Sequence, residues 1–322
     1  MSRKVIRLVL ISVFALILCG FQRLSAQTPY QDEYTDEFAF SPGGSFSLNN
    51  VRGTVRITGT DEESFTLRAV KIVTKAESRQ QAEKMLGRVT IEVKKGEKTV
   101  SVTTRYPKGK KTFSFEEDRE EDSSEDSPGS LIGKLSRAWG KLVDAVSGEL
   151  DFDFGTGVPV EVNYEIRLPR FTVVEVNNVD GKVEIIEIEG DLEANLVNGD
   201  FSLICLDGDI EANLVNGSMH IVAASGSIEA NNINGSIDFE SAGIERKRGA
   251  GFNVMNGDVL IRLDESAAVN LELTTFAGEV EVEMPVTIEG KINRKRIIGE
   301  LNGGGPPIEV NVINGDIRVK KI

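Results

Sequence analysis

The chain has 322 residues, of which 51 are acidic and 37 basic, so its formal net charge at pH 7 is −14. This acidity argues against nucleic acid or an anionic membrane as the partner of the whole molecule. With two cysteines and one histidine, the sequence excludes a disulfide framework and a Cys/His metal centre. Its length suffices for a hydrophobic core that needs no disulfides.

Residues 1–26 have the pattern of a signal peptide, in which basic residues precede the apolar run 8–18 and Ala26 offers a small residue for cleavage. The run is shorter than a membrane-spanning helix requires. Two alternatives are lipidation at Cys19 and retention of the segment as a membrane anchor. We predict export to the periplasm, the cell surface or the medium. Cys205 is then the only cysteine of the mature chain, and we expect it to be buried and unreactive.

Residues 27–43 are predicted to lead into a first structured region, residues 44–104. In it, residues 44–52 fit the repeat described below. A strand over 64–74, a helix from Thr74 to about residue 86 and two further strands (89–93 and 99–104) then follow. Thr74 and Glu77 have the spacing of a capping box at the start of that helix. We interpret this β-α-β-β piece as a cap over an exposed sheet edge.

Residues 105–150 interrupt the pattern. The acidic stretch 116–126 is almost free of apolar residues, which predicts a disordered loop. Residues 131–146 have the spacing of an amphipathic helix with one basic face. This helix is a candidate either for docking on the rest of the molecule or for lying on a membrane surface. Its apolar face is predicted to carry Leu131, Leu135, Trp139, Leu142 and Val146.

Residues 151–322 form the main repeat region, in which glycine recurs every nine residues from Gly181 to Gly235. Apolar residues recur at the third, fifth and eighth places of each unit and are predicted to point inward, whereas the fourth place points outward. Two kinds of unit alternate, one with Asn at its sixth place, so the full period is eighteen residues. This pattern predicts an all-β fold: a single-stranded β-solenoid (β-helix) of about 18 residues per coil.

The repeat pattern leads to two further expectations, one about the stacked residues and one about the last repeat. Identical residues at equivalent places should stack in columns about 4.8 Å apart, so that the asparagines hydrogen-bond along the stack. The chain closes on a last repeat, 315–319, followed by Lys320 and Lys321. Lysines at that place would discourage pairing at an open sheet edge.

Two columns on the predicted surface are candidates for contact. The first is a column of glutamates, which is either a solvated face that resists aggregation or a contact face for cations or a basic partner. The second is a row of three branched apolar residues at outward sixth places, which we expect to be covered, with the helix over 131–146 as a candidate cover. The glutamates are Glu175, Glu193, Glu211 and Glu229, and the apolar row is Ile186, Ile204 and Val222.

The sequence predicts no catalytic residue, cofactor site or metal site. His220 lies at an outward fourth place, and no Ser or Cys nucleophile has a recognised spacing to it. The repeats lack the paired glycines and regular aspartates of calcium-binding nonapeptide repeats. We therefore expect a protein that is not an enzyme. A carbohydrate-active enzyme is kept as an alternative, because some β-helices cleave polysaccharides.

Several motifs together resemble one bacterial family. They are the exported start, the V-N-G corners, the strand that ends at Pro169, and the terminal G-G-G-P-P and V-I-N-G-D-I-R-V stretches. The resemblance is to the β-strand-repeat family named "putative adhesin", a domain family of unknown function, and it covers residues 35–322 apart from 105–150. It implies a cell-envelope protein that contacts a protein or glycan and transfers no catalytic residue. Some relatives imply instead an accessory role in an envelope-stress signalling module.

Overall fold

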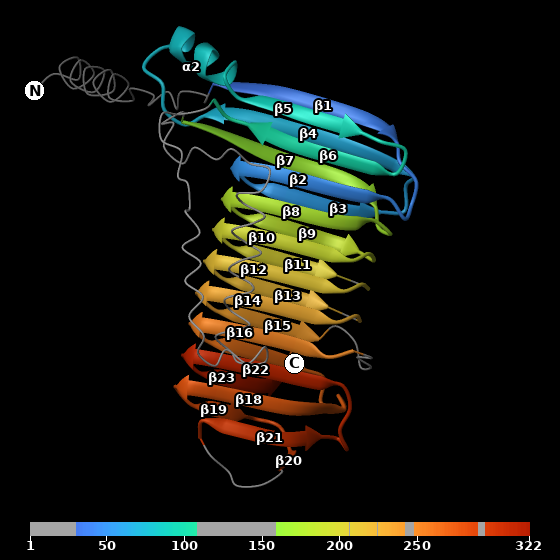
Figure 1. Ribbon diagram of the computed structural model, residues 1–322, viewed down its shortest axis with the longest axis vertical. Helices are drawn as coiled ribbons and strands as arrows, with labels where there is room; N and C mark the ends of the chain where they lie inside the picture. The colour runs from blue at the N-terminus through green and yellow to red at the C-terminus, as the bar shows by residue number, and fades with distance from the viewer. Residues whose placement is uncertain (1–29, 108–158, 206, 224, 242–247, 289–293) are drawn as a thin grey trace, which may run out of the picture.

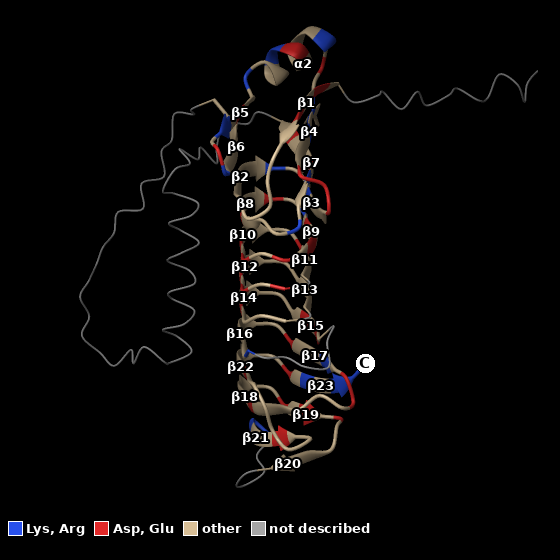
Figure 2. Cartoon of the chain, turned by 90° about the vertical axis from the view of Figure 1, so that its right-hand side faces the viewer, with Lys and Arg blue, Asp and Glu red and all other residues tan. Residues whose placement is uncertain are grey.

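The computed structural model describes residues 30–107, 159–205, 207–223, 225–241, 248–288 and 294–322. In these ranges the chain is all-β apart from one helix, and its strands form two sheets that face each other along an elongated rod (Figure 1). Figure 2 shows the two sheets edge-on, with the core between them. The predicted signal peptide and the predicted helix over 131–146 lie outside the described residues.

Sheet A has eleven strands and sheet B has twelve, and the strands of both are ordered from the end that carries the helix α2 (Arg79–Leu86). Sheet A runs in the order β1 (Gln31–Ala39), β4 (Ser64–Val73), β7 (Val160–Pro169), β3 (Val55–Thr60), β9 (Val183–Ile188), β11 (Phe201–Cys205), β13 (Met219–Ala223), β15 (Ile237–Ser241), β17 (Val259–Leu263), β23 (Ile317–Lys321) and β19 (Val280–Val282). Sheet B runs in the order β5 (Thr90–Lys95), β6 (Thr99–Arg105), β2 (Ser45–Arg52), β8 (Val173–Asp180), β10 (Leu192–Asn198), β12 (Ile210–Asn216), β14 (Ile228–Asn234), β16 (Ala250–Asn256), β22 (Pro307–Asn314), β18 (Val269–Ala277), β21 (Arg296–Leu301) and β20 (Val286–Ile288).

The strands in the middle of the rod pair parallel and in register. Leu192 of β10 lies opposite Ile210 of β12, and Phe201 of β11 lies opposite Met219 of β13, so paired residues are eighteen positions apart. A strand of sheet B and the following strand of sheet A make one coil. Third and fifth places point into the core, where Leu203 is fully buried. The repeated apolar residues therefore form one continuous core along the rod.

The corner glycines are required by close approach between coils. Gly199 has φ +133, and a Cβ added to it would lie 2.1 Å from the carbonyl oxygen of Gly181 in the preceding coil. The same clash recurs at Gly217 against Gly199, at 1.7 Å. No side chain fits between corners that stack this closely, which explains why glycine opens each unit.

The sixth-place asparagines form a buried ladder along sheet B. Each Nδ2 donates to the Oδ1 of the asparagine in the neighbouring coil at 2.9–3.2 Å. An unpaired buried amide would cost about 1–3 kcal/mol, so the ladder requires every coil to stay in register. Its members are Asn49, Asn177, Asn195, Asn213, Asn231, Asn253 and Asn311.

The eighth places behave differently in the two kinds of unit. Ile188 is fully buried in the core, as predicted. In the Asn-bearing units the prediction is wrong: Val215 is buried but lies outside the core cluster, and Val197 is half-buried. The physical reason is that the seventh place, Leu196 or Leu214, points into the core, so the eighth place, next along the strand, points away from it. These side chains stack along one edge of the rod in what we call the corner column: Val51, Val179, Val197, Val215, Ile233, Met255, Ile313 and Phe276.

The order of the coils in space departs from their order in the chain. The last coil does not lie at an open edge, because β22 pairs with both β16 and β18, and β23 pairs with both β17 and β19. β21 runs antiparallel to β18, which returns the chain to the side from which β22 can enter the stack. The expectation that Lys320 and Lys321 guard an open edge is therefore wrong. On the side of the short strand β19 only Ile317–Val319 of β23 are paired, whereas Lys320 and Lys321 pair with β17 on the other side.

Antiparallel strands end the parallel stack at both ends of the rod. At one end, β4 pairs antiparallel with β1 and β7, and β5 pairs antiparallel with β6. At the other end, β21 pairs antiparallel with β18 and β20. The β4–α2–β5–β6 segment lies at the first end, where α2 buries Ala82 and Leu86 (Figure 1). In each sheet the short or strongly charged outermost strands limit further pairing.

The helix α2 begins later than predicted. Ser78 is the N-cap, and its side chain accepts a hydrogen bond from the backbone N–H of Gln81. The Gln81 side chain accepts in turn from the backbone N–H of Glu77. Ser78 and Gln81 therefore provide the capping interactions that the sequence assigned to Thr74 and Glu77.

A buried polar chain joins the α2 end to the repeat strands. The Tyr164 hydroxyl lies 2.6 Å from the Thr104 hydroxyl, which donates to Asn50 Oδ1, and Asn50 Nδ2 donates to Asn178 Oδ1. Burial raises the pKa of Tyr164 well above its ordinary value, so the phenol stays neutral in this chain. Strands β6, β7, β2 and β8 contribute one residue each, so residues on both sides of the undescribed segment 108–158 share one interior.

Candidate functional site

The predicted glutamate column lies on the outer face of sheet B. Glu175, Glu193, Glu211 and Glu229 occupy paired positions in the adjacent strands β8, β10, β12 and β14. The column is interrupted at Gly251 of β16 and continues in β22 and β18 with Glu309 and Glu272. Carboxylates on neighbouring strands are about 4.8 Å apart, so the face presents a regular line of negative charge.

The asparagine ladder holds this glutamate column in place. The spare N–H of Asn177, Asn195 and Asn213 donates to the Oε1 of the glutamate two residues earlier, at 3.0–3.4 Å. One carboxylate oxygen of Glu175, Glu193 and Glu211 is therefore fixed by the buried ladder, while the side chains remain at the surface. Such a pre-ordered line can meet a basic partner at several points with little loss of side-chain entropy.

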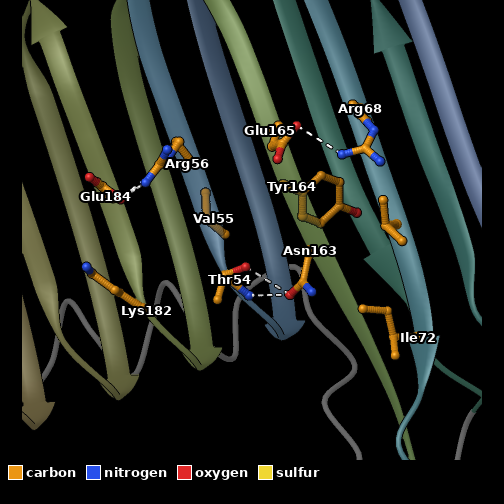
Figure 3. A pocket seen from close by; sticks show the side chains of 11 residues that line it. Thr54, Val55, Arg56, Arg68, Ile72, Asn163, Tyr164, Glu165, Lys182 and Glu184 are labelled. Atoms are coloured by element: carbon orange, nitrogen blue, oxygen red, sulfur yellow. Dashed lines mark hydrogen bonds and ion pairs between the residues drawn. The ribbon is translucent and has the colours of Figure 1, made fainter. Parts of the chain in front are cut away.

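The outer face of sheet A is hollowed near the α2 end. The hollow has a volume of about 560 Å³, and outward residues of β4, β7, β3 and β9 line it (Figure 3). Val70 and Ile72 form its apolar part. Asn163 lies beside them, and its Oδ1 accepts from both the backbone and the hydroxyl of Thr54 at 2.8 and 3.0 Å.

The arginines and glutamates that line the hollow form ion pairs, and Lys182 also lines it. Arg56 binds Glu184 at 2.7 Å, and Arg68 bridges Glu33 at 2.8 Å and Glu165 at 3.1 Å. Figure 3 shows both glutamates turned toward their arginines. General acid–base catalysis needs a carboxyl that can reach the reacting atoms and exchange a proton with them. Here each carboxylate is held by a guanidinium, and this arrangement suits polar recognition better than proton transfer.

The structure brings together three residues that sequence reasoning left apart. Ser202, His220 and Asp238 occupy paired outward positions in β11, β13 and β15. His220 Nδ1 lies 3.7 Å from Asp238 Oδ2, and Arg262 also binds Asp238. The expectation that no serine is spaced around His220 is therefore incomplete. The sequence contained the information needed to find this row, because each of its residues lies eighteen positions, or one coil, after the one before.

This row has the residue types of a catalytic triad but lacks the geometry of one. Within the described residues, no hydrogen bond joins Ser202 to His220, and Arg262 competes for the carboxylate that would orient the imidazole. The neighbouring backbone N–H groups are used in the sheet, so none converges on an oxyanion position. The row lies on the outer face of sheet A, and none of its residues lines the hollow.

The apolar row at the sixth places is adjacent to these residues. Ile186, Ile204 and Val222 pair in register in β9, β11 and β13, and the next residue in the row is Glu240. Ile204 is exposed, and its two neighbours are half-buried. The candidate cover (Leu131, Leu135, Trp139, Leu142 and Val146) lies outside the described residues.

Metal and thiol chemistry find no support in the described part of the chain. No group of three or more His, Cys, Asp or Glu side chains there is arranged to hold a metal ion. Cys205 is buried, and burial raises the pKa of its thiol to about 12, which keeps it protonated at neutral pH. Its Sγ donates to the carbonyl oxygen of Ile188. In the same ranges, no helix has the length and apolarity needed to cross a bilayer.

Comparison with known families adds one clear result. A family model described as Toastrack DUF4097 matches residues 201–320, from the start of β11 to the end of β23. Residues 201–320 are therefore similar to the Toastrack family. This confirms the predicted resemblance to a β-strand-repeat family of unknown function, and the Toastrack description names no catalytic activity. The matched stretch contains Glu211, Glu229 and His220, whereas the hollow lies before its first residue.

Solved structures that match this chain include the following two. A "putative cell adhesion protein" from Clostridium sporogenes ATCC 15579 is 13% identical, with a TM-score of 0.34, over 90% of this chain and 100% of that chain. A "putative adhesin" from Bacteroides fragilis NCTC 9343 is 9% identical, with a TM-score of 0.26, over 91% and 99% of the two chains. TM-scores this low support no functional conclusion. No curated protein matches the sequence.

Proposed function

We propose that the protein is an exported, non-catalytic contact protein of the cell envelope. In this proposal it is a two-sided β-solenoid with eighteen residues per coil, closed at one end by the β4–α2–β5–β6 segment. Residues 1–26 are a signal peptide and 27–43 a lead-in. Residues 44–104 form the first coil and cap, 105–150 an insertion, and 151–322 the repeat rod. The mature rod acts in the periplasm, at the cell surface or after secretion.

The observation that supports this proposal most is the glutamate column on sheet B. Four identical carboxylates stand on four adjacent strands, and asparagines of the buried ladder hold three of them. A rigid line of equivalent groups favours a partner that makes repeated contacts, because linked weak contacts add up to avidity. The partner chemistry that fits is a basic protein surface or an amine-bearing glycan.

The hollow on sheet A favours a glycan ligand as a second candidate for contact. It combines apolar floor residues with amide, guanidinium and carboxylate groups, which suits recognition of a polar ligand. Its paired charges speak against the alternative of a carbohydrate-active enzyme. The alternative role in envelope-stress signalling would use the same surfaces, and no particular contact favours it.

The predicted helix over 131–146 is proposed to make one of two alternative contacts. In the first, its apolar face covers the row formed by Ile186, Ile204 and Val222. In the second, it lies on a membrane surface. The two ends of the undescribed segment meet at one place, where the Tyr106 hydroxyl donates to the Val160 carbonyl at 3.0 Å. The chain before the helix is long enough for the helix to reach the apolar row, since about twenty extended residues span roughly 65 Å.

Binding to isolated envelope material tests the contact role. The purified mature protein should sediment with envelope fractions, and a Glu193→Lys/Glu211→Lys double variant should lose at least about tenfold in affinity. A matched control, Glu240→Lys/Glu265→Lys, makes the same charge change away from sheet B. Equal binding by the two double variants would exclude the glutamate column, and release of sugar fragments from the fractions would exclude a non-catalytic protein.

A further inference from the structure

The corner column ends in an exposed aromatic residue at the end of the rod that is remote from α2. Phe276 is 75% exposed, whereas Val215, in the same column, is 8% exposed. The cause is the end of the stack: β21 pairs with β18 only as far as Arg296 opposite Thr274, so no strand covers Phe276. It is the most exposed large apolar side chain among the described residues.

Three consecutive basic residues lie beside Phe276. They are Arg294, Lys295 and Arg296, and all three are exposed. Lys295 Nζ donates to the Phe276 carbonyl oxygen at 2.8 Å and lies 5.8 Å from the centre of its ring. The ammonium group and the ring are therefore held together at one end of a molecule whose net charge is strongly negative.

The two arginines form ion pairs that are exposed to solvent and therefore weak. Arg294 contacts Glu279 at 3.3 Å, with the side chains 85% and 67% exposed. Arg296 contacts Glu272 at 2.9 Å, with both side chains about half exposed. Ion pairs in water at this exposure contribute little stability, so either guanidinium can exchange its carboxylate for another anion.

We propose that this end patch, formed by Phe276, Arg294, Lys295 and Arg296, contacts an anionic lipid bilayer. The ring would enter the interface while the cations bind lipid phosphates. A single projecting ring suits a fluid surface, which needs no complementary groove. The acidity of the other faces would keep the rod standing end-on. The inference rests on the proposed contact role and specifies the chemistry of one contact.

Vesicle sedimentation tests this proposal with the full mature chain. Vesicles of phosphatidylcholine with about one third phosphatidylglycerol should bind the protein, pure phosphatidylcholine vesicles should not, and added salt should weaken the binding. Arg294→Glu should lower binding about tenfold, and Phe276→Ser should lower it severalfold. Thermal melts should be unchanged, because both side chains are exposed.

Two control variants match these changes elsewhere on the rod. Phe171→Ser removes another exposed ring, 53% exposed, whose neighbour Arg170 is held by Asp61 and Glu189. Arg79→Glu reverses an exposed, ion-paired arginine of α2, at the opposite end of the rod. Loss of binding in these controls equal to that in the patch variants would overturn the proposal, because binding would follow net charge or apolarity in general.

Three other results would also overturn the proposal. They are no vesicle binding by the unaltered protein, loss of binding in Trp139→Ser with full binding in Phe276→Ser, and binding to a soluble anionic polysaccharide in place of vesicles. The glutamate-column variants used above should bind vesicles at least as well as the unaltered protein. Failure of the envelope-binding test and failure of the lipid test are therefore separate outcomes.

Discussion

Leu203 and Glu211 are single residues that test the inward and outward places of the repeat. Leu203 has no exposed surface, so Leu203→Asp would bury a carboxylate without a partner and should lower the free energy of unfolding by more than about 4 kcal/mol. Glu211→Lys changes a surface side chain and relieves repulsion in the column, so it should change stability by less than about 1 kcal/mol. Thermal melts followed by circular dichroism measure both. Equal losses would contradict the assignment of the two faces.

At the scale of single residues, the sequence predicted which residues lie opposite one another in neighbouring strands. It did not predict the direction in which every side chain points. The in-register asparagines and glutamates follow from an eighteen-residue period, and the structure places them as the period requires. Val197 was assigned to the core because apolar residues recur at the eighth place, whereas Leu196 points into the core and the next residue therefore points away from it. The row of Ser202, His220 and Asp238 was missed because motif spacing was sought along the strand instead of across coils.

Among the structural elements, the outer face formed by β9, β11 and β13 gives a prediction about the segment 131–146. Trp139 is the only tryptophan of the chain, so its fluorescence reports on that segment alone. If the predicted helix covers the apolar row, Ile204→Asp should shift the Trp139 emission to the red by exposing the indole to water. The control Val173→Asp changes a side chain that is 48% exposed at the start of β8 in sheet B, and it should have no effect.

The same measurement separates the two proposed forms of that helix. If Ile204→Asp leaves the Trp139 emission unchanged and anionic vesicles shift it to the blue, the helix lies on the membrane. Emission typical of water in the unaltered protein, with and without vesicles, would contradict both forms.

The elements of the α2 end show a second limit of sequence reasoning. Strand, helix and two strands were predicted in the right order, because each has its own apolar period. The start of the helix was placed too early, because Thr74–Glu77 and Ser78–Gln81 both satisfy the spacing of a capping box. Local spacing does not distinguish two such candidates, and the choice is made by the contacts of Ala82 and Leu86 with the interior.

For the whole molecule, the coil order has a consequence for stability. Because β22 and β23 each pair on both sides, removing residues 307–322 should detach β18, β19, β20 and β21 as well. Limited proteolysis with mass spectrometry should then yield a folded fragment that ends soon after β17. A matched double variant, Lys320→Glu/Lys321→Glu, should keep the full pattern of protection. Continued protection of β18 after the truncation would contradict the interleaved order.

The sequence could not have predicted this order. The coils share the same inward pattern, and all but the coil of β18, which has Thr274 at the sixth place, share the asparagine, so the repeat leaves most neighbours interchangeable. The order is decided by β21, which runs antiparallel to β18 and belongs to the connection between coils. The residues of this connection do not follow the repeat pattern.

Chemical labelling of carboxyl groups on the bound protein is the most direct test of the proposed contact role. After labelling, mass spectrometry compares each carboxylate in the free protein and in the protein bound to envelope fractions. We predict that labelling of Glu193 and Glu211 falls severalfold on binding, whereas Glu240 and Glu265 label equally in both states. Unchanged labelling along the whole glutamate column in the bound protein would contradict the proposal that this face makes the contact.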